Sequence, residues 1–234
     1  RPRLTAYASL LRYGTPADVG AACEKRAAQG FTAIKLHQID VPSVQAARRA
    51  VGPTVDIMLD TNCPWTPSEA ARMAREFQPY GLAWLEEPIW PPEDYEALSA
   101  LRKVAPMPIA LGENESTAYG FREIVAKGAA DILQPSVTKV GGIGEARRIA
   151  ALASIAGVQV VPHSFYFGPG LAATMHLAAS FTGSGLVEFP SYTLEVPLLA
   201  DPIVAKDGAV APPSVPGLGV ELNEEALRRY PANV

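Results

Sequence analysis

Cysteine, histidine and long apolar runs are all scarce in this sequence. The two cysteines, Cys23 and Cys63, lack metal-type spacing and make a poor disulfide framework, so a reducing, cytoplasmic location is expected. No apolar run reaches the roughly 18 residues that a membrane-spanning helix needs. Lys and Arg number 20 against 24 Asp and Glu, a net charge of −4. The sequence therefore predicts neither nucleic acid nor a membrane as a partner.

The chain does contain a regular alternation of apolar strand-like runs and amphipathic helical stretches. Stretches such as "PADVGAACEKRAAQG" and "PSEAARMAREFQPYG" begin with proline and end in glycine, as helices do. The alternation predicts βα units, and eight strands without a break in composition favour a closed barrel over an open sheet. The predicted strands are Leu4–Leu11, Phe31–Leu36, Val55–Leu59, Ala83–Leu85, Ile109–Leu111, Asp131–Leu133, Val158–Val161 and Leu186–Phe189.

A polar residue closes each predicted strand from the second onward, at intervals of 23 to 27 residues. A barrel gathers the C-terminal ends of its strands at one mouth, where the active sites of this fold lie. Independent strand ends would not be expected to collect so many acids and histidines by chance, so one site is predicted. Its members are His37, Asp60, Glu86, Glu113, Ser136, His163 and Glu188.

Asp60, Glu86 and Glu113 form an acidic group on consecutive strands. Converging carboxylates repel one another unless a cation neutralises them. The donors are all oxygen, so a hard ion is favoured, Mg²⁺ with Mn²⁺ as an alternative. The competing interpretation is that each acid caps the helix that follows it. In "LEEP", alternation lets only one of Glu86 and Glu87 point inward, and the residues alone do not rank them.

The motifs at these strand ends are similar to those of a known family. "KLH", "LDTN", "LEEP" and "LGEN" mark strands two to five, and "QPSVTKVGGI", "VPHSF" and "LVEFP" mark strands six to eight. With the tail "PGLGVELNEEALRRY", nearly the whole chain resembles the barrel domain of the enolase superfamily, in its mandelate racemase and acid-sugar dehydratase subgroup. The resemblance implies an α/β fold, a TIM-type (β/α)7β barrel over residues 1–190. It also implies Mg²⁺ held by Asp60, Glu86 and Glu113, and so selects Glu86 over Glu87.

The resemblance further implies roles for the residues around the acids. Strand two of relatives usually ends Lys-x-Lys, in which the first lysine contacts the substrate carboxylate and the second can act as a base. Lys35 matches the first, and His37 replaces the second with a group that titrates near neutrality. His163 is the strand-seven candidate base. Relatives commonly pair it with Asp where this chain has Ser136, so His163 is expected to be less basic here.

Three polar residues are expected to contact the substrate. Glu188 matches a position that hydrogen-bonds the substrate carboxylate as a neutral acid, and nearby carboxylates are expected to raise its pKa. Asn62 and Ser136 are candidate substrate contacts, and for Asn62 a supporting role behind the metal ligands is equally open.

The reaction implied is Mg²⁺-dependent removal of the proton α to a carboxylate, through an enediolate, in a hydroxy acid such as an acid sugar. Dehydration is the favoured outcome. Racemisation or epimerisation and lactone cycloisomerisation pass through the same enediolate and stay open. A non-catalytic barrel that binds metal and carboxylates is the alternative from another class, and the retained acids and proton carriers argue against it.

Residues 191–234 are predicted to form a tail outside the barrel. In the superfamily such a tail packs on an N-terminal capping domain. The chain starts mid-pattern at "RPRLTAYASL" without a methionine, so we expect a longer protein whose capping domain is missing from this sequence. The surface that faces the cap would then be exposed. The full-length protein is expected to be a homo-oligomer with a small-molecule carboxylate, an acid sugar, as its substrate.

Overall fold

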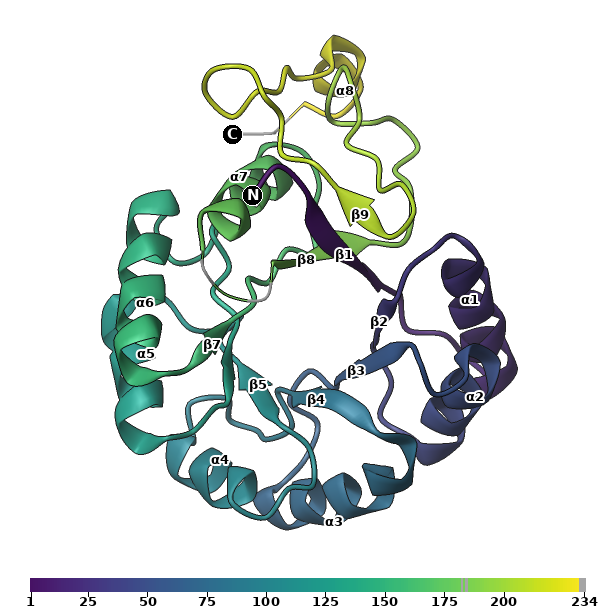
Figure 1. The fold of residues 1–234 in the computed structure, drawn as a ribbon, viewed down its shortest axis with the longest axis vertical. Helices are drawn as coiled ribbons and strands as arrows, with labels where there is room; N and C mark the ends of the chain where they lie inside the picture. The colour runs from purple at the N-terminus through teal and green to yellow at the C-terminus, as the bar shows by residue number, and fades with distance from the viewer. Residues whose placement is uncertain (182, 184, 232–234) are drawn as a thin grey trace.

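Eight parallel strands curl into a ring with the helices on its outside (Figure 1). The computed structural model describes residues 1–181, 183 and 185–231. The strand order along the sheet is β7-β6-β5-β4-β3-β2-β1-β8. Every predicted strand is present with its ends within two residues, and the predicted barrel is confirmed. The strands are β1 (Leu4–Ser9), β2 (Ala33–Leu36), β3 (Asp56–Asp60), β4 (Leu82–Glu86), β5 (Ile109–Leu111), β6 (Ile132–Leu133), β7 (Gln159–Val160) and β8 (Leu186–Pro190).

The helices begin and end where free backbone groups find partners. Thr15 caps the start of the first helix, and Thr66 and Glu69 form a reciprocal capping box at the third. Gly128 and Gly157 take the left-handed conformation just after the fifth and sixth. The barrel helices are α1 (Pro16–Ala28), α2 (Val41–Val51), α3 (Pro67–Phe77), α4 (Tyr95–Arg102), α5 (Thr117–Lys127), α6 (Ile143–Ala156) and α7 (Pro169–Ser180). None of the helices in the described part of the chain is long and apolar enough to cross a lipid bilayer.

A layer of mainly apolar side chains, six from strands and one from directly after β7, fills the barrel interior. Its members are Tyr7, Ala33, Met58, Trp84, Ala110, Ile132 and Val161. Side chains alternate along a strand, so the next inward position lies two residues further toward the C-terminal mouth. Those positions are occupied by Ser9, Lys35, Asp60, Glu86, Gly112, Gln134 and His163. The alternation thus places a polar layer on an apolar one, and it selects Glu86 because Trp84 points inward.

Hydrogen bonds between Ser164, in the loop after β7, and Glu188 of β8 connect the two ends of the sheet. The Ser164 N–H donates to Glu188 Oε2 at 2.7 Å, and Ser164 Oγ donates to the Glu188 backbone oxygen at 2.7 Å. On its other edge β8 pairs in parallel with β1, with Tyr7 opposite Glu188. Glu188 therefore lies at the closure of the barrel as well as in its mouth.

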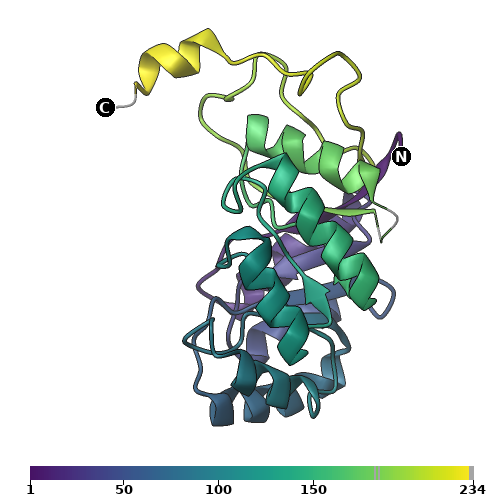
Figure 2. The ribbon, with the colours of Figure 1, turned by 90° about the vertical axis from the view of Figure 1, so that its left-hand side faces the viewer.

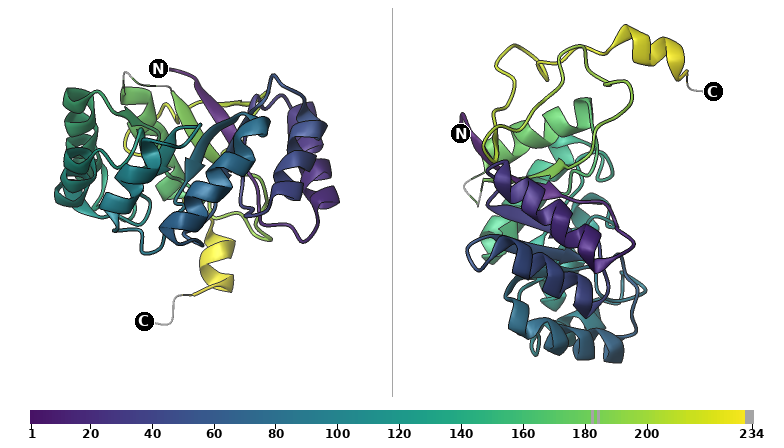
Figure 3. Two further views of the ribbon diagram at one scale, coloured as in Figure 1. Left: turned by 90° about the horizontal axis from the view of Figure 1, so that it is seen from below. Right: turned by 90° about the vertical axis from the view of Figure 1, so that its right-hand side faces the viewer.

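Residues 191–231 form an irregular extension on one side of the barrel (Figure 2). Within it, β9 (Ala209–Val210) pairs antiparallel with the start of β1. The final helix, α8 (Glu224–Arg229), stands apart from the ring of strands (Figure 3). The exposed apolar side chains of the extension are Leu198, Val204, Val215, Leu222, Leu227 and Tyr230. That the extension packs on a capping domain stays a prediction.

Candidate active site

Lys35 lies at the centre of a fully buried group of charges in the barrel mouth. Its Nζ is 2.8 Å from Glu188 Oε1, 2.9 Å from Glu86 Oε1 and 3.2 Å from Asp60 Oδ2. Burial lowers the pKa of Lys35, but the three carboxylates outweigh it, and the net pKa lies well above the ordinary value. Lys35 is therefore a fixed cation and is unsuited to act as a base.

The three predicted metal ligands converge. Asp60, Glu86 and Glu113 each bring one carboxylate oxygen within 4.8 Å of the others. Burial raises the pKa of Asp60, but Lys35 and His37 outweigh it and the net pKa is low. Burial raises the pKa of Glu86 well above its ordinary value, even beside Lys35. The carboxylates of the mouth carry more negative charge than the single ammonium of Lys35 can neutralise. Oxygen-only donors with this surplus of negative charge fit a hard dication such as Mg²⁺ or Mn²⁺.

The prediction that the pKa of Glu188 is raised is wrong. Burial does raise it, but Lys35 at 2.8 Å, then His163 and the Ser164 N–H, lower it more, and the pKa falls to about 2. Ser9 Oγ also donates to Glu188 Oε1 at 2.7 Å. The sequence showed the neighbouring acids, but it did not show that Lys35 and two further donors face this carboxylate. Glu188 is an ionised acceptor in this arrangement.

The low pKa of Glu188 predicts a loss of stability in acid. The pKa falls from its ordinary 4.5 to about 2 on folding. The ionised Glu188 therefore contributes fully to the free energy of unfolding above pH 4.5, and this contribution is lost as the pH falls toward 2. For this one group the loss is on the order of 3 kcal/mol. Urea unfolding of the metal-free protein and of Glu188→Gln between pH 7 and 2.5 measures it. The stability difference between the two should shrink with acidity; parallel curves would contradict the prediction.

His37 is held by the backbone so that one ring nitrogen faces the acids. Its Nδ1 lies 2.5 Å from the Leu10 carbonyl oxygen, which can only accept, so Nδ1 is the donor. Nε2 then faces the acidic group and lies 3.2 Å from Asp60 Oδ2. The Phe165 ring packs beside the imidazole, with centroids 5.2 Å apart. These contacts fix His37 beside the acidic group on the β2 side of the mouth.

His163 approaches the acids from the end of β7. Its Nε2 lies 3.0 Å from Glu113 Oε2, while its buried Nδ1 has no hydrogen-bond partner in the described part of the chain. Burial lowers the pKa of His163, and the nearby Glu188 and Glu113 offset this only in part. The buried Ser136 directs its Oγ to Thr138 Oγ1, 3.1 Å away. No hydrogen bond between Ser136 and His163 is found among the described residues, so Ser136 does not serve as the partner of His163 Nδ1. The carboxylate contact of His163 is made by Nε2, to Glu113.

Asn62 supports Asp60, one of the predicted metal ligands. Its backbone N–H and its Nδ2 both donate to Asp60 Oδ1, at 3.1 and 2.9 Å. This arrangement requires a left-handed backbone, φ 55° at Asn62, which asparagine tolerates better than most residues. Of the two roles left open for Asn62, the contacts favour the supporting one. Direct contact of Asn62 or Ser136 with a substrate stays a prediction.

Several polar residues of the mouth were not predicted from the sequence to be site residues. Ser9 and Gln134 occupy inward positions two residues after the apolar layer, so the alternation was the signal that could have found them. Lys139 Nζ lies 3.5 Å from Glu113 Oε1. The Tyr7 hydroxyl and the Gln134 amide are buried and have no hydrogen-bond partner in the described residues, although Gln134 lies close enough to Glu86 to lower its pKa. Unpartnered polar atoms beside the acids are typical of a site that receives a ligand.

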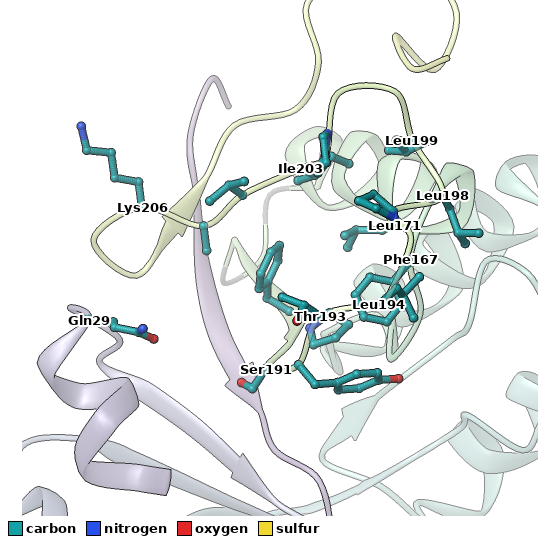
Figure 4. A pocket seen from close by; sticks show the side chains of 18 of the residues that line it. Gln29, Phe167, Leu171, Ser191, Thr193, Leu194, Leu198, Leu199, Ile203 and Lys206 are labelled. Carbon is teal, nitrogen blue, oxygen red and sulfur yellow. The ribbon is translucent and has the colours of Figure 1, made fainter. Parts of the chain in front are cut away.

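A cavity of about 520 Å³ lies elsewhere, on the outer face of β8 (Figure 4). Phe189, Leu171 of α7 and the loop from Pro190 to Asp207 form much of its wall. The wall is mainly apolar, and among the described residues that line it there is no member of the acidic group. It offers no set of carboxylates for a metal and no histidine for proton transfer. The barrel mouth is therefore the candidate active site.

Comparison with known proteins places the barrel in a family. A family model described as "Enolase C-terminal domain-like" matches residues 18–226. D-galactarolactone cycloisomerase of Agrobacterium fabrum is 34% identical over 221 residues, which cover 88% of this chain and 58% of that protein. D-xylonate dehydratase of Haloferax volcanii is 32% identical over 196 residues, which cover 83% of this chain and 47% of that protein.

A solved structure supports the same family assignment. The crystal structure of the 3,6-anhydro-D-galactonate cycloisomerase from Zobellia galactanivorans superposes with a TM-score of 0.91 at 30% identity, covering 98% of this chain and 66% of that one. The chain thus spans about half to two thirds of the length of these relatives. By its family match, its barrel and its acidic trio, the chain belongs to the enolase superfamily, as a C-terminal barrel domain of the mandelate racemase and muconate lactonizing enzyme group.

Proposed function

We propose that the protein removes the proton α to the carboxylate of an acid sugar in a Mg²⁺-dependent reaction, and that the outcome is dehydration. The observation that carries this proposal is one buried mouth that holds a fixed cation, three convergent carboxylates and two histidines. Asp60, Glu86 and Glu113 would hold the metal. When bound, Mg²⁺ supplies positive charge that offsets the negative charge developing on the substrate carboxylate.

Lys35 would bind the substrate carboxylate. Its raised pKa keeps the ammonium charged, and its burial among acids holds Nζ in one place. A fixed, preorganised cation stabilises the negative charge that spreads onto the carboxylate oxygens as the α-proton leaves. Glu188 and Ser9 would hold Lys35 at that position, because Glu188 contacts Nζ and Ser9 anchors Glu188.

The two histidines would divide the proton transfers. The lowered pKa of His163 keeps its imidazole neutral near pH 7, ready to accept the α-proton. On the other side, His37 Nε2 would deliver a proton to the departing β-hydroxyl. The Cα–H bond breaks and its electron pair forms the Cα=Cβ double bond. This electron pair first spreads onto the carboxylate oxygens, so the Cβ–O bond breaks in a later step. The hydroxyl then leaves with the proton from His37 as water.

Lactone cycloisomerisation is the second candidate. Two of the relatives above are cycloisomerases by name. Nδ1 of His163 has no hydrogen-bond partner in the described part of the chain, so no carboxylate at that nitrogen supports the protonated imidazole. The two outcomes share α-proton removal and differ in the group expelled. Analysis of products from linear acid sugars and from their lactones distinguishes them. Racemisation or epimerisation would instead return a proton to the α-carbon.

Exchange of the α-proton with solvent tests the proposal. The protein is incubated with a library of acid sugars and lactones in D₂O with Mg²⁺, and deuterium at Cα is measured by NMR and mass spectrometry. Incorporation that needs Mg²⁺ and is absent in Glu113→Gln is the expected result, because that substitution removes one metal ligand. A broad library without exchange would favour a barrel that binds metal and carboxylates without catalysis.

A further inference from the structure

The loops that follow β3, β4 and β5, next to the three predicted metal ligands, are connected at one buried side chain, Glu87. This residue follows Glu86 and is only 3% exposed. Its backbone φ of 44° lies in the left-handed region, which turns its side chain away from the inward direction of Glu86. A buried carboxylate in a strained backbone conformation is costly, so its contacts need to compensate for that cost.

The side chain of Glu87 reaches into the loops on both sides. Its Oε2 accepts a hydrogen bond from Asn114 Nδ2 at 2.7 Å, and Cys63 Sγ lies 3.5 Å from the same oxygen. Asn114 directly follows Glu113, and Cys63 lies three residues after Asp60. One carboxylate thus contacts the loops after β3 and β5 while its own backbone belongs to the loop after β4.

The backbone of Glu87 adds to the connection. The Cys63 N–H donates to the Glu87 carbonyl oxygen at 2.7 Å, and Thr61 Oγ1 donates to it at 3.0 Å. Cys63 is also left-handed, with φ 54°. The turn after Asp60 is therefore shaped around Glu87, and the same turn places the Asn62 amide on Asp60.

We propose that Glu87 is a positioning residue that holds Asp60 and Glu113 in register with Glu86 for divalent metal binding. It contacts no substrate and supplies no ligand atom; it acts through Asn114 and the turn at Cys63. The inference rests on the proposed metal-dependent function. Hydrogen-bonded partners of this kind typically change metal affinity by about 10- to 100-fold when removed.

Mn²⁺ binding, followed by the EPR signal of the free ion, tests this role without a substrate. The 234-residue chain is compared with Glu87→Ala, Glu87→Gln and Glu96→Ala, a control that removes an exposed carboxylate paired with Lys127 on the helix surface. Glu87→Ala is expected to bind Mn²⁺ about 10- to 100-fold more weakly. Glu87→Gln keeps an acceptor oxygen for Asn114 and should recover most of the affinity. Glu96→Ala should bind as the unaltered chain does.

Each other outcome overturns the inference in a recognisable way. Glu87→Ala with unchanged affinity, whatever its thermal stability, would show a purely structural role. Equal weakening by Ala and Gln would show that charge matters and that the hydrogen bonds do not. Weaker binding by the Asn114→Ala and Glu87→Ala double variant than by Glu87→Ala alone would show that the two residues act separately and not through one connection. An unaltered chain that binds no Mn²⁺ would overturn the metal-dependent function as well.

Discussion

Replacing Lys35 by methionine is expected to lower the free energy of unfolding of the metal-free protein by about 3–5 kcal/mol at neutral pH. Methionine fills a similar volume but leaves Asp60, Glu86 and Glu188 buried without their shared cation. Losing one partner of a buried ionic group is costly because the remaining charges stay desolvated. Urea unfolding followed by circular dichroism measures the change.

The same substitution at an exposed lysine is the matched control. Lys127 pairs with Glu96 on the surface, where the lysine side chain is 40% exposed and the glutamate 83%. Lys127→Met should therefore change stability by less than about 1 kcal/mol. Equal losses at the two positions would show that the Lys35 contacts contribute no more than a surface ion pair. Protonation of the stranded acids should also make the Lys35→Met deficit smaller at pH 4.5 than at pH 7.

Substituting the two histidines is expected to separate the two halves of the reaction. His163→Asn should remove deuterium exchange at Cα and product formation together, because it removes the base. His37→Asn should retain exchange while product formation falls by about 10²–10⁴-fold, because the departing group loses its proton donor. Both rates are measured on one substrate at one pH, deuterium exchange by NMR and product formation by chromatography.

A histidine outside the mouth provides the control for these two variants. His176 of α7 hydrogen-bonds the Leu218 carbonyl outside the mouth, so His176→Asn should leave exchange and product formation unaffected. If deuterium exchange were lost only in His37→Asn, His37 would be the base and His163 the proton donor. Retained exchange in both variants would show that neither histidine is the base and would remove the proposed proton pathway.

The hydrophobic pattern was sufficient to predict the barrel. Strand-like runs and helix caps such as the Thr66–Glu69 box are local signals, and the eight predicted strands appear in the structure. The acidic trio followed from the same pattern, because in a closed barrel residues at the ends of different strands must share one mouth. The choice of Glu86 over Glu87 followed from the resemblance, and the structure supplies its physical reason in the inward position of Trp84.

By itself, then, the sequence determined the fold class, the family resemblance and which strand ends could carry the chemistry, because each depends on periodicity and spacing along the chain. Tertiary structure alone decided the electrostatics, because a pKa depends on which groups face one another across the mouth. The pKa of Glu188 was expected to rise, but Lys35 lowers it. The Leu10 carbonyl orients the His37 ring. Glu87 is visible in "LEEP", but only folding brings Cys63 and Asn114 to its carboxylate.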